Sequence, residues 1–157
     1  MAATVILQFR SNLAASAQTV WAEASTMTGV NAELGPWLRM SYPARAERLG
    51  DADVAAGTVF FWSWLLLFGL LPIDRHALRL ERLYPGAGFD ERSHSLSQKS
   101  WVHRRRVVRI SDSSCMLTDE LEFTPRIALM AAFLKPVVTA LFRHRHRRLM
   151  ARYGEAT

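Results

Sequence analysis

The feature that most constrains the fold is a series of short strand-like segments that ends in one long helix. Strand-forming residues gather in four segments, at 76–84, 89–98, 101–110 and 115–123. Turn-forming residues separate these segments at 85–88 and 111–114, so we expect an antiparallel meander. The longest helical pattern then covers 127–152. It is the only element long enough to cover the apolar face of a curved sheet.

The N-terminal part adds two strands and two short helices. Residues 4–10 and 37–42 predict strands, and Ser16 and Asn31 are each placed to cap a short helix. We therefore expect an α+β fold in which a curved antiparallel sheet and the long helix enclose an apolar cavity. Pro136 predicts either a kink in that helix or the start of a second helix.

The most apolar segment covers 58–71. Its aromatic and β-branched start favours a strand with two apolar faces, although 65–67 fit a helix equally well. Its most hydrophobic run, 59–71, is thirteen residues long and contains Ser63 and Gly69. A membrane-spanning helix needs roughly 20 apolar residues, so we expect no simple span.

The totals describe one globular domain covering 1–157. Of the 157 residues 50% are hydrophobic and 22% charged, which is enough for a single core and too apolar for disorder. The single cysteine, Cys115, excludes an internal disulfide framework and a multi-cysteine metal site. The first ten residues lack the basic start of a signal peptide, so we expect a cytoplasmic protein.

Much of the net charge of +6 is concentrated at 143–148. A basic surface can favour nucleic acid or anionic lipid, but no base-reading motif accompanies this run. We therefore expect no specific nucleic-acid partner. His144 and His146 are two residues apart and point about 200° apart on a helix, which does not suit one metal ion. We expect neither a metal nor a cofactor.

Several short motifs follow one another along nearly the whole chain. They are 5–9, Val20-Trp21, 57–72, Gly88-Phe89, 101–104, 117–125 and 142–149. Their order and spacing resemble those of the START/polyketide-cyclase-like (SRPBCC) superfamily. The resemblance implies a helix-grip fold, in which a seven-stranded antiparallel sheet wraps around the C-terminal helix and two short helices follow the first strand. It also implies a hydrophobic tunnel for a lipid, quinone or polyketide-like molecule.

The superfamily has no universal catalytic motif, so the resemblance carries over no catalytic residue. This chain departs from the commoner pattern in its bulky run at 60–64. Those rings could fill the tunnel.

His103 and Asp119 are the sharpest polar candidates, because they fall on strands joined by one turn. If both point inward, the carboxylate can orient the imidazole as a general base or as a polar anchor for a ligand. The alternative is a buried hydrogen bond that only fixes strand register. An odd pairing register would instead place Arg106 opposite Asp119.

Arg104 to Arg106 are consecutive and must divide between the two sheet faces. An inward Arg105 could hold a ligand carboxylate, whereas an arginine that extends from the end of the barrel is the alternative. Glu91, Arg92 and His94 either add polar groups to the cavity or form ion pairs at the surface.

Aromatic and aliphatic residues complete the predicted binding set, with ordinary core packing as their alternative role. The wall candidates are Trp62, Trp64, Phe68, Phe89, Trp101 and Phe123, joined by His76, Leu78, Leu121 and Leu141.

Three functions remain open at this point. The leading hypothesis is a carrier or sensor, not an enzyme, that binds a hydrophobic small molecule, with His103, Asp119 and one arginine at its polar end. The second is a cyclase/dehydratase-type enzyme with His103 as acid/base. The third is a membrane-peripheral or protein-interaction module, or a homodimer, that uses residues 60–71; the basic C-terminal helix would assist membrane contact.

Overall fold

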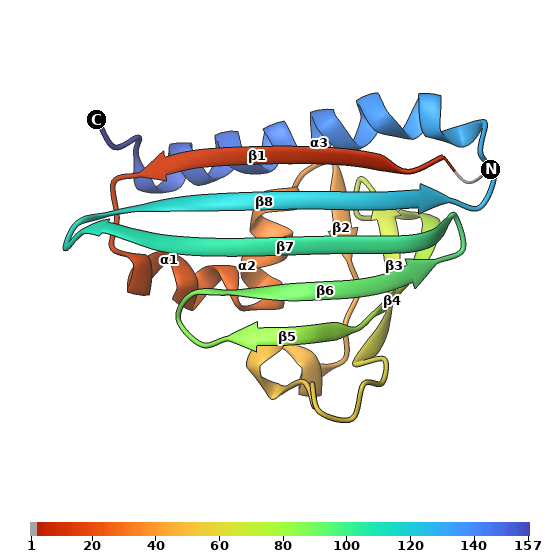
Figure 1. Ribbon diagram of the computed structural model, residues 1–157, viewed down its shortest axis with the longest axis horizontal. Helices are drawn as coiled ribbons and strands as arrows, with labels where there is room; N and C mark the ends of the chain where they lie inside the picture. The colour runs from red at the N-terminus through yellow and green to blue at the C-terminus, as the bar shows by residue number, and fades with distance from the viewer. Residues whose placement is uncertain (1–2) are drawn as a thin grey trace.

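A computed structural model describes residues 3–157 (Figure 1). The elements follow one another as β1 (Val5–Leu13), α1 (Ala17–Ala24), α2 (Met27–Leu34), β2 (Leu38–Met40), two 3₁₀ turns (Ala44–Ala46 and Leu49–Asp51), β3 (Phe61–Leu67), β4 (Leu71–Leu78), β5 (Leu80–Tyr84), β6 (Gly88–Ser95), β7 (Gln98–Ser111), β8 (Ser114–Pro125) and α3 (Met130–Tyr153). This succession confirms the predicted α+β class.

The strands form one antiparallel sheet in the order β1-β8-β7-β6-β4-β3-β2, with β5 also paired to β6. Only Arg79 separates β4 from β5, and both pair with β6, so they are two parts of one bent strand. The sheet thus has seven strand positions, as predicted. It curls around α1, α2 and α3, which lie behind it in Figure 1, and this is the expected helix-grip architecture.

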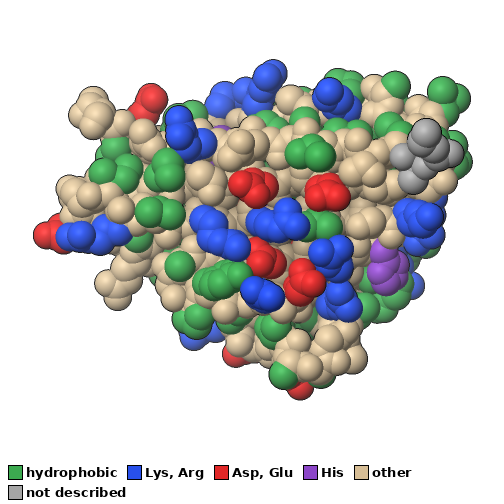
Figure 2. Space-filling view, in the orientation of Figure 1, with side chains coloured by type: hydrophobic (Ala, Val, Ile, Leu, Met, Phe, Trp, Pro, Cys, Tyr) green, Lys and Arg blue, Asp and Glu red, His purple; other side chains and the backbone are tan. Residues whose placement is uncertain are grey.

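The pairing of β7 with β8 decides which side chains face the helices. His103 pairs with Leu121 and Arg105 with Asp119, so the register is even and all four side chains point to the concave face. The predicted odd-register alternative, with Arg106 opposite Asp119, is wrong. On the convex face, acidic and basic side chains are interspersed over β8, β7 and β6 (Figure 2).

The α3 helix is continuous from Met130 to Tyr153, although Pro136 lies inside it. Proline has no N–H, so the helix lacks one hydrogen bond, the one that residue 136 would donate to the carbonyl of Ala132, and this single loss does not end the helix. The buried face of α3 carries Val138, Phe142 and Leu149, which pack on the apolar side chains of β1, β7 and β8. Gly154 ends the helix with a φ of 80°.

The α1–α2 corner places α2 against α3. Ser16 caps α1 as predicted, since its Oγ accepts a hydrogen bond from the Thr19 N–H. Thr26, not Asn31, caps α2, so that sequence prediction was wrong. The Asn31 side chain instead binds both the N–H and the carbonyl of Met40, and so ties α2 to β2.

Two further boundaries differ from the sequence prediction. The segment 65–67 belongs to β3 and pairs with both β2 and β4, which excludes the helical alternative. The turn between β6 and β7 falls at 96–97 instead of 99–100, because Asp74 of β4 binds Ser95 and Ser97 there. Within residues 3–157, no helix combines the length and the apolar character that crossing a membrane requires.

A substitution at Gly29 in α2 can test how closely α1 and α2 approach each other. A Cβ at Gly29 would lie 1.9 Å from the Glu23 carbonyl oxygen, whereas one at Gly50 would meet nothing closer than 3.9 Å. Helix propensity alone predicts that Gly29→Ala stabilises the protein by about 1 kcal/mol. We expect the clash to prevail and the free energy of unfolding in urea to fall by about 2 kcal/mol.

Gly50→Ala is the matched control, because its new methyl group fits the space available. It should change the free energy of unfolding by less than about 1 kcal/mol. Equal stability of the two variants would contradict the close approach.

Candidate functional site

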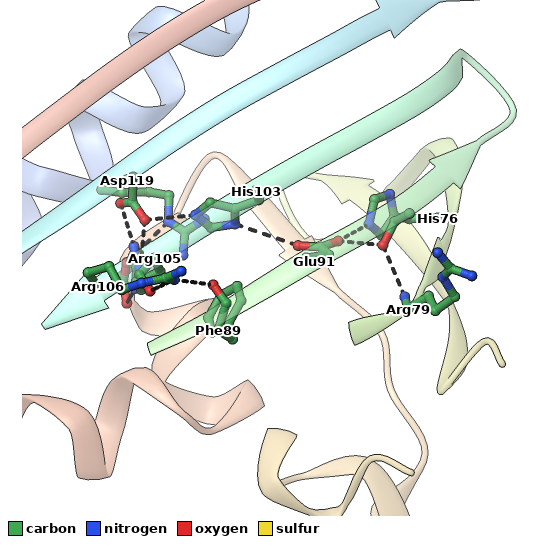
Figure 3. A network of polar contacts seen from close by, with 11 residues as sticks. His76, Arg79, Phe89, Glu91, His103, Arg105, Arg106 and Asp119 are labelled. Atoms are coloured by element: carbon green, nitrogen blue, oxygen red, sulfur yellow. Dashed lines mark hydrogen bonds and ion pairs between the residues drawn. The ribbon is translucent and has the colours of Figure 1, made fainter. Parts of the chain in front are cut away.

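A row of buried charged and imidazole side chains crosses the concave face of the sheet (Figure 3). We call this set the charged network; its members are Glu33, His76, Glu91, His103, Arg105, Asp119, Arg145 and His146. They come from α2, from four strands and from α3. Figure 3 follows part of the row from Asp119 through His103 and Glu91 to His76.

Arg105 lies at the centre of the charged network, and its side chain is 0% exposed. On one side its Nε and Nη2 groups donate to the two Asp119 oxygens at 2.7 and 2.8 Å. On the other side Nη1 and Nη2 donate to the two Glu33 oxygens at 2.9 and 2.8 Å. One guanidinium therefore holds two carboxylates bidentately, which joins β7, β8 and α2.

Glu33 also accepts a hydrogen bond of 3.1 Å from the Nε group of Arg145, and this contact brings in α3. Burial by itself would raise the pKa values of Glu33 and Asp119. The charge of Arg105 lowers both, with Arg145 assisting at Glu33, so that the pKa of each carboxyl lies below its usual value. Both carboxylates are therefore held ionised in the interior.

His103 lies between two carboxylates. Its Nε2 is 2.7 Å from Asp119 Oδ1 and its Nδ1 is 3.5 Å from Glu91 Oε2. The rings of Phe89 and Phe142 meet it edge-on, with centroids 5.2 and 5.3 Å away. Both ring nitrogens thus already face acidic partners, and aromatic rings cover the imidazole.

Glu91 carries the row on to His76. Its Oε1 is 2.6 Å from His76 Nε2 and accepts a hydrogen bond of 2.7 Å from the Ser93 hydroxyl. Burial by itself would raise the pKa of Glu91, but hydrogen bonds from His103 and His76 lower it well below the usual 4.5. At the other end of the network, His146 joins Asp119 to Ser11 at 2.9 and 2.7 Å.

The row alternates imidazole and carboxylate groups from His76 to His146, and this has a chemical consequence. The three carboxylates and two guanidiniums of the whole charged network sum to one negative charge, so one protonated imidazole makes the network neutral. Such an alternation can hold a proton, or move it between neighbouring groups, without exposing a charge to the apolar interior.

The His76 end of the network carries polar atoms with free hydrogen-bonding capacity. Gln98 Oε1 is buried without a hydrogen-bond partner among the described residues. Within residues 3–157, His76 Nδ1 also has no hydrogen-bond partner. Ser95 links the two, because it pairs with His76 across β4 and β6 and its hydroxyl accepts the Gln98 N–H. We call His76, Gln98 and the adjoining Trp101, whose ring is 6.3 Å from that of His76, the open end.

The structure brings most of the predicted binding residues to the concave face. These are His76, Leu78, Phe89, Trp101, His103, Arg105, Asp119, Leu121 and Phe123. Leu141 lies half-buried on α3.

Trp62, Trp64 and Phe68 do not line an interior, so the prediction of a wall role for them was wrong. Strand alternation buries Phe61 and Ser63, and it leaves Trp62 and Trp64 on the outer side at 46% and 43% exposed. There Arg75 lies over both indole rings, 5.3 and 5.1 Å from their centroids. Phe68 is exposed in the β3–β4 turn with a φ of 54°.

The predicted contact between His103 and Asp119 exists, but Arg105 differs from expectation. We predicted an arginine free to hold a ligand carboxylate, whereas the donors of Arg105 are taken up by Glu33 and Asp119. His103 is also less available for acid/base chemistry than predicted, because Glu91 and Asp119 flank it.

Two members of the network were hidden in the basic run of α3. The sequence places Arg145 and His146 in the basic run at 143–148, which we expect to be a basic surface, yet both are buried. The signal was present in the spacing, since Val138, Phe142, Arg145 and Leu149 recur at intervals of four, three and four residues. Such an interval places Arg145 on the apolar stripe of the helix.

The two acidic partners were also missed. The sequence pattern assigns no role to Glu33. The residue directly precedes the buried Leu34 in a short helix, and it is itself buried. Glu91 was expected to form a surface ion pair more readily than a buried one. Of Glu91, Arg92 and His94, it is Arg92 that forms an exposed ion pair, at 3.3 Å from Glu81.

Two hollows lie to the side of the charged network, and of its members Glu33 lines the smaller one. One groove of about 540 Å³ runs along the convex side of β6 and β7 between Arg79, Arg92 and Lys99. A smaller one of about 60 Å³ lies between α1, α2 and the end of α3. On the concave side, side chains of the network and stacked rings such as Trp101 and Phe123, 5.5 Å apart, occupy the space where the sequence predicted an apolar cavity.

Comparison with known proteins supports the fold. The model of a family described as a domain of unknown function (DUF8410) matches residues 11–153. No curated protein gives a significant match. A START superfamily protein from Mycobacterium smegmatis has a TM-score of 0.65 at 12% identity, with 94% of this chain and 96% of that chain covered.

Two enzymes of known structure share the architecture. The Zhui aromatase/cyclase from a Streptomyces species has a TM-score of 0.69 at 13% identity, covering 96% of this chain and 93% of its own. Norcoclaurine synthase from Thalictrum flavum, in complex with dopamine and hydroxybenzaldehyde, has a TM-score of 0.57 at 11% identity, covering 96% and 88%. These likenesses establish the helix-grip fold.

Asp119→Asn should destabilise the protein strongly, because an amide cannot accept from Arg105, His103 and His146 as a carboxylate does. We expect the free energy of unfolding to fall by about 3–5 kcal/mol, measured by urea titration. Glu120→Gln is the control, since the neighbouring side chain is exposed on the convex face, and it should change stability by no more than about 0.5 kcal/mol. Similar small losses in both variants would contradict the central role of Asp119.

Acid should unfold the protein partly through Glu91. Its pKa is depressed in the folded state, so below its usual value of 4.5 the unfolded chain binds more protons and stability falls with pH. Glu91→Gln should reduce this slope by up to about 1.4 kcal/mol per pH unit, measured by urea titrations between about pH 6 and about pH 3. A slope equal to that of the wild type would show that Glu91 takes no part.

Proposed function

This chain belongs to the family described as a domain of unknown function (DUF8410), and on that premise we propose that it binds an amphipathic small molecule at the open end, as a carrier or sensor. The observation that carries the proposal is the buried Gln98 Oε1, which has no hydrogen-bond partner in residues 3–157. An unpaired buried acceptor costs about 1–3 kcal/mol, and a ligand that donates a hydrogen bond would remove that penalty.

The side chains around Gln98 define the polar end of such a ligand. The register of β7 and β8 pairs Gln98 with Pro125, on the concave side that also carries Trp101. His76 Nδ1 supplies a second polar contact, because Glu91 engages only the Nε2 atom. A hydroxyl or amine group on the ligand would meet Gln98 and His76 while Trp101 packs on the adjoining ring or chain.

The apolar body of the ligand would lie between the first turns of α3 and the β3–β4 hairpin. Met130 and Val137 on the helix and Leu71 on the hairpin keep apolar surface exposed in this region. The hydrogen bonds of α2 to α3, at Arg145 and Arg148, engage only the C-terminal half of the helix. Outward movement of the first turns could therefore admit a ligand while the charged network stays intact.

The known structures support a ligand of this kind. Norcoclaurine synthase is described with dopamine and hydroxybenzaldehyde, which are aromatic molecules with polar substituents. An aromatase/cyclase shares the same fold. Polar groups at one end of an aromatic interior match that chemistry in this chain.

Acid/base catalysis is the second candidate function, and the geometry favours His76 for it over His103. Glu91 orients His76 through Nε2 and leaves Nδ1 to exchange a proton with a ligand, in the manner of a carboxylate–imidazole pair. His103 faces carboxylates through both nitrogens. A cyclase- or dehydratase-type reaction at this end would therefore depend on His76.

Binding can be tested with N-phenyl-1-naphthylamine, a fluorescent apolar probe that carries one N–H donor. We expect Gln98→Leu to weaken its binding about tenfold, which corresponds to the loss of one hydrogen bond in a closed site. The same substitution should leave the free energy of unfolding unchanged or raise it, because it removes an unpaired acceptor. Fluorescence titration and urea titration measure the two effects.

Gln8→Leu is the matched control, since Gln8 is exposed on the convex side of β1, and its probe affinity should equal that of the wild type. Failure of the wild-type protein to bind either the probe or any component of a lipid extract would refute the proposal. Equal probe affinity of Gln98→Leu and the wild type would show that the probe does not bind at Gln98, and would refute the proposed site.

A further inference from the structure

One end of the molecule carries an unusual number of exposed apolar side chains, and they come from three separate segments. The β3–β4 hairpin exposes Phe68, Leu70, Leu71 and Ile73, and Trp37 joins it from the residue before β2. A single exposed apolar residue on a protein surface is ordinary, but a cluster of this kind marks an interaction site.

The second and third segments are the β6–β7 turn and the start of α3. The turn exposes Leu96 at 64%. The helix start exposes Leu129 at 84% and Phe133 at 62%, together with Ile127 and Val137. We call the three segments together the apolar end.

Hydrogen bonds and ring contacts show that the three segments adjoin. The Trp37 ring is 6.0 Å from Phe68 and 6.4 Å from His144 of α3. On a helix His144 lies on the same face as Val137 and Phe133, at intervals of seven and four residues.

The β6–β7 turn lies between the β3–β4 hairpin and the start of α3 and contacts both segments. The Leu96 N–H donates to the carbonyl of Arg75 in β4, and the Arg126 N–H donates to the carbonyl of Ser97. The apolar end therefore forms one rim that runs from the start of α3, at the right in Figure 1, to the hairpin of β3 and β4, which lie behind β7 and β8 in that view.

The charges around the apolar end are predominantly positive. Residues 123–154 contain no acidic residue, and residues 58–80 contain a single one, Asp74. The Asp74 carboxylate is occupied by the Ser95 hydroxyl and the Ser97 N–H. Arg39, Arg75 and Arg126 are exposed in the same segments. Apolar side chains framed by cations are complementary to an anionic lipid surface.

We propose that the apolar end docks on the surface of an anionic lipid bilayer. The hairpin and the first turns of α3 insert their apolar side chains among the acyl chains, with Trp37 at the headgroup level, where indole rings are favoured. The neighbouring arginines bind lipid phosphates. The contact stays peripheral, because no helix among the described residues can cross the membrane.

The bilayer is favoured over a second copy of the chain because of the charge arrangement. Two copies that met through this end would bring their arginines together without carboxylates to offset them. A phospholipid surface supplies the missing negative charge and accepts an irregular apolar rim without needing shape complementarity.

Co-sedimentation with vesicles tests the proposal. The full chain is mixed with vesicles of phosphatidylcholine and phosphatidylglycerol in equal parts, and with vesicles of phosphatidylcholine alone. We expect binding to the first and at least tenfold weaker binding to the second. Raising the salt from about 0.1 M to about 0.5 M should weaken binding to the anionic vesicles, because it screens the arginines.

Two single variants should lower the partition coefficient at least tenfold, Leu70→Glu in the hairpin and Phe133→Glu in the helix. Both side chains are exposed, so the variants should keep the circular dichroism spectrum and urea midpoint of the wild type. Ile110→Glu is the matched control, because Ile110 is 54% exposed near the β7–β8 hairpin at the opposite end of the molecule, and it should bind vesicles like the wild type.

Three results would overturn the proposal. They are absence of binding to anionic vesicles, equal binding to both kinds of vesicle, and an equal loss in all three variants. Sedimentation equilibrium would identify a second copy as the partner if Leu70→Glu and Phe133→Glu dissociated a dimer that binds no vesicles. Gln98→Leu should leave vesicle binding unchanged, so failure at the membrane is distinguishable from failure of the ligand site.

Discussion

The structure depends on one guanidinium group. Arg105 lies fully buried in the middle of the concave face, where a single ion would be prohibitively destabilising, and it is tolerated because Glu33 and Asp119 bind it from both sides. This arrangement joins the sheet to α2, and Arg145 extends it to α3. The sheet, α2 and α3 are thus held at positions in which Arg105 is paired with both Glu33 and Asp119.

A buried charge cluster determines which packing geometry the sheet and helices adopt more than it stabilises the folded protein. Apolar side chains of equal volume would give comparable or greater stability, so the network explains why the elements adopt one geometry and not why the protein is folded. Its presence also changes the expected character of the interior. Where a helix-grip fold can hold an apolar tunnel, this chain places imidazoles, carboxylates and guanidiniums, and within residues 3–157 free hydrogen-bonding capacity remains at His76 and Gln98.

The open end and the apolar end lie around the same part of α3. The first turns of that helix make few polar contacts, whereas its C-terminal half is held by Arg145, His146 and Arg148. Local stability should therefore be lowest where the proposed ligand enters and where the proposed membrane contact forms. A ligand that partitions into lipid could pass between the two without crossing the polar convex face of the sheet.

The sequence by itself determined what is local. Period-two alternation placed Leu121 and Phe123 on one face of the last strand with Asp119 as the polar exception there, and turn residues separated the strands, because both signals act between near neighbours in the chain. Tertiary structure alone decided the register of β7 with β8 and the rotation of α3. It also decided which charges meet, because Glu33 and Arg105 are 72 residues apart and Glu33 and Arg145 are 112 apart. No local pattern encodes such a pairing, since it exists only once the sheet has curled and the helices have packed.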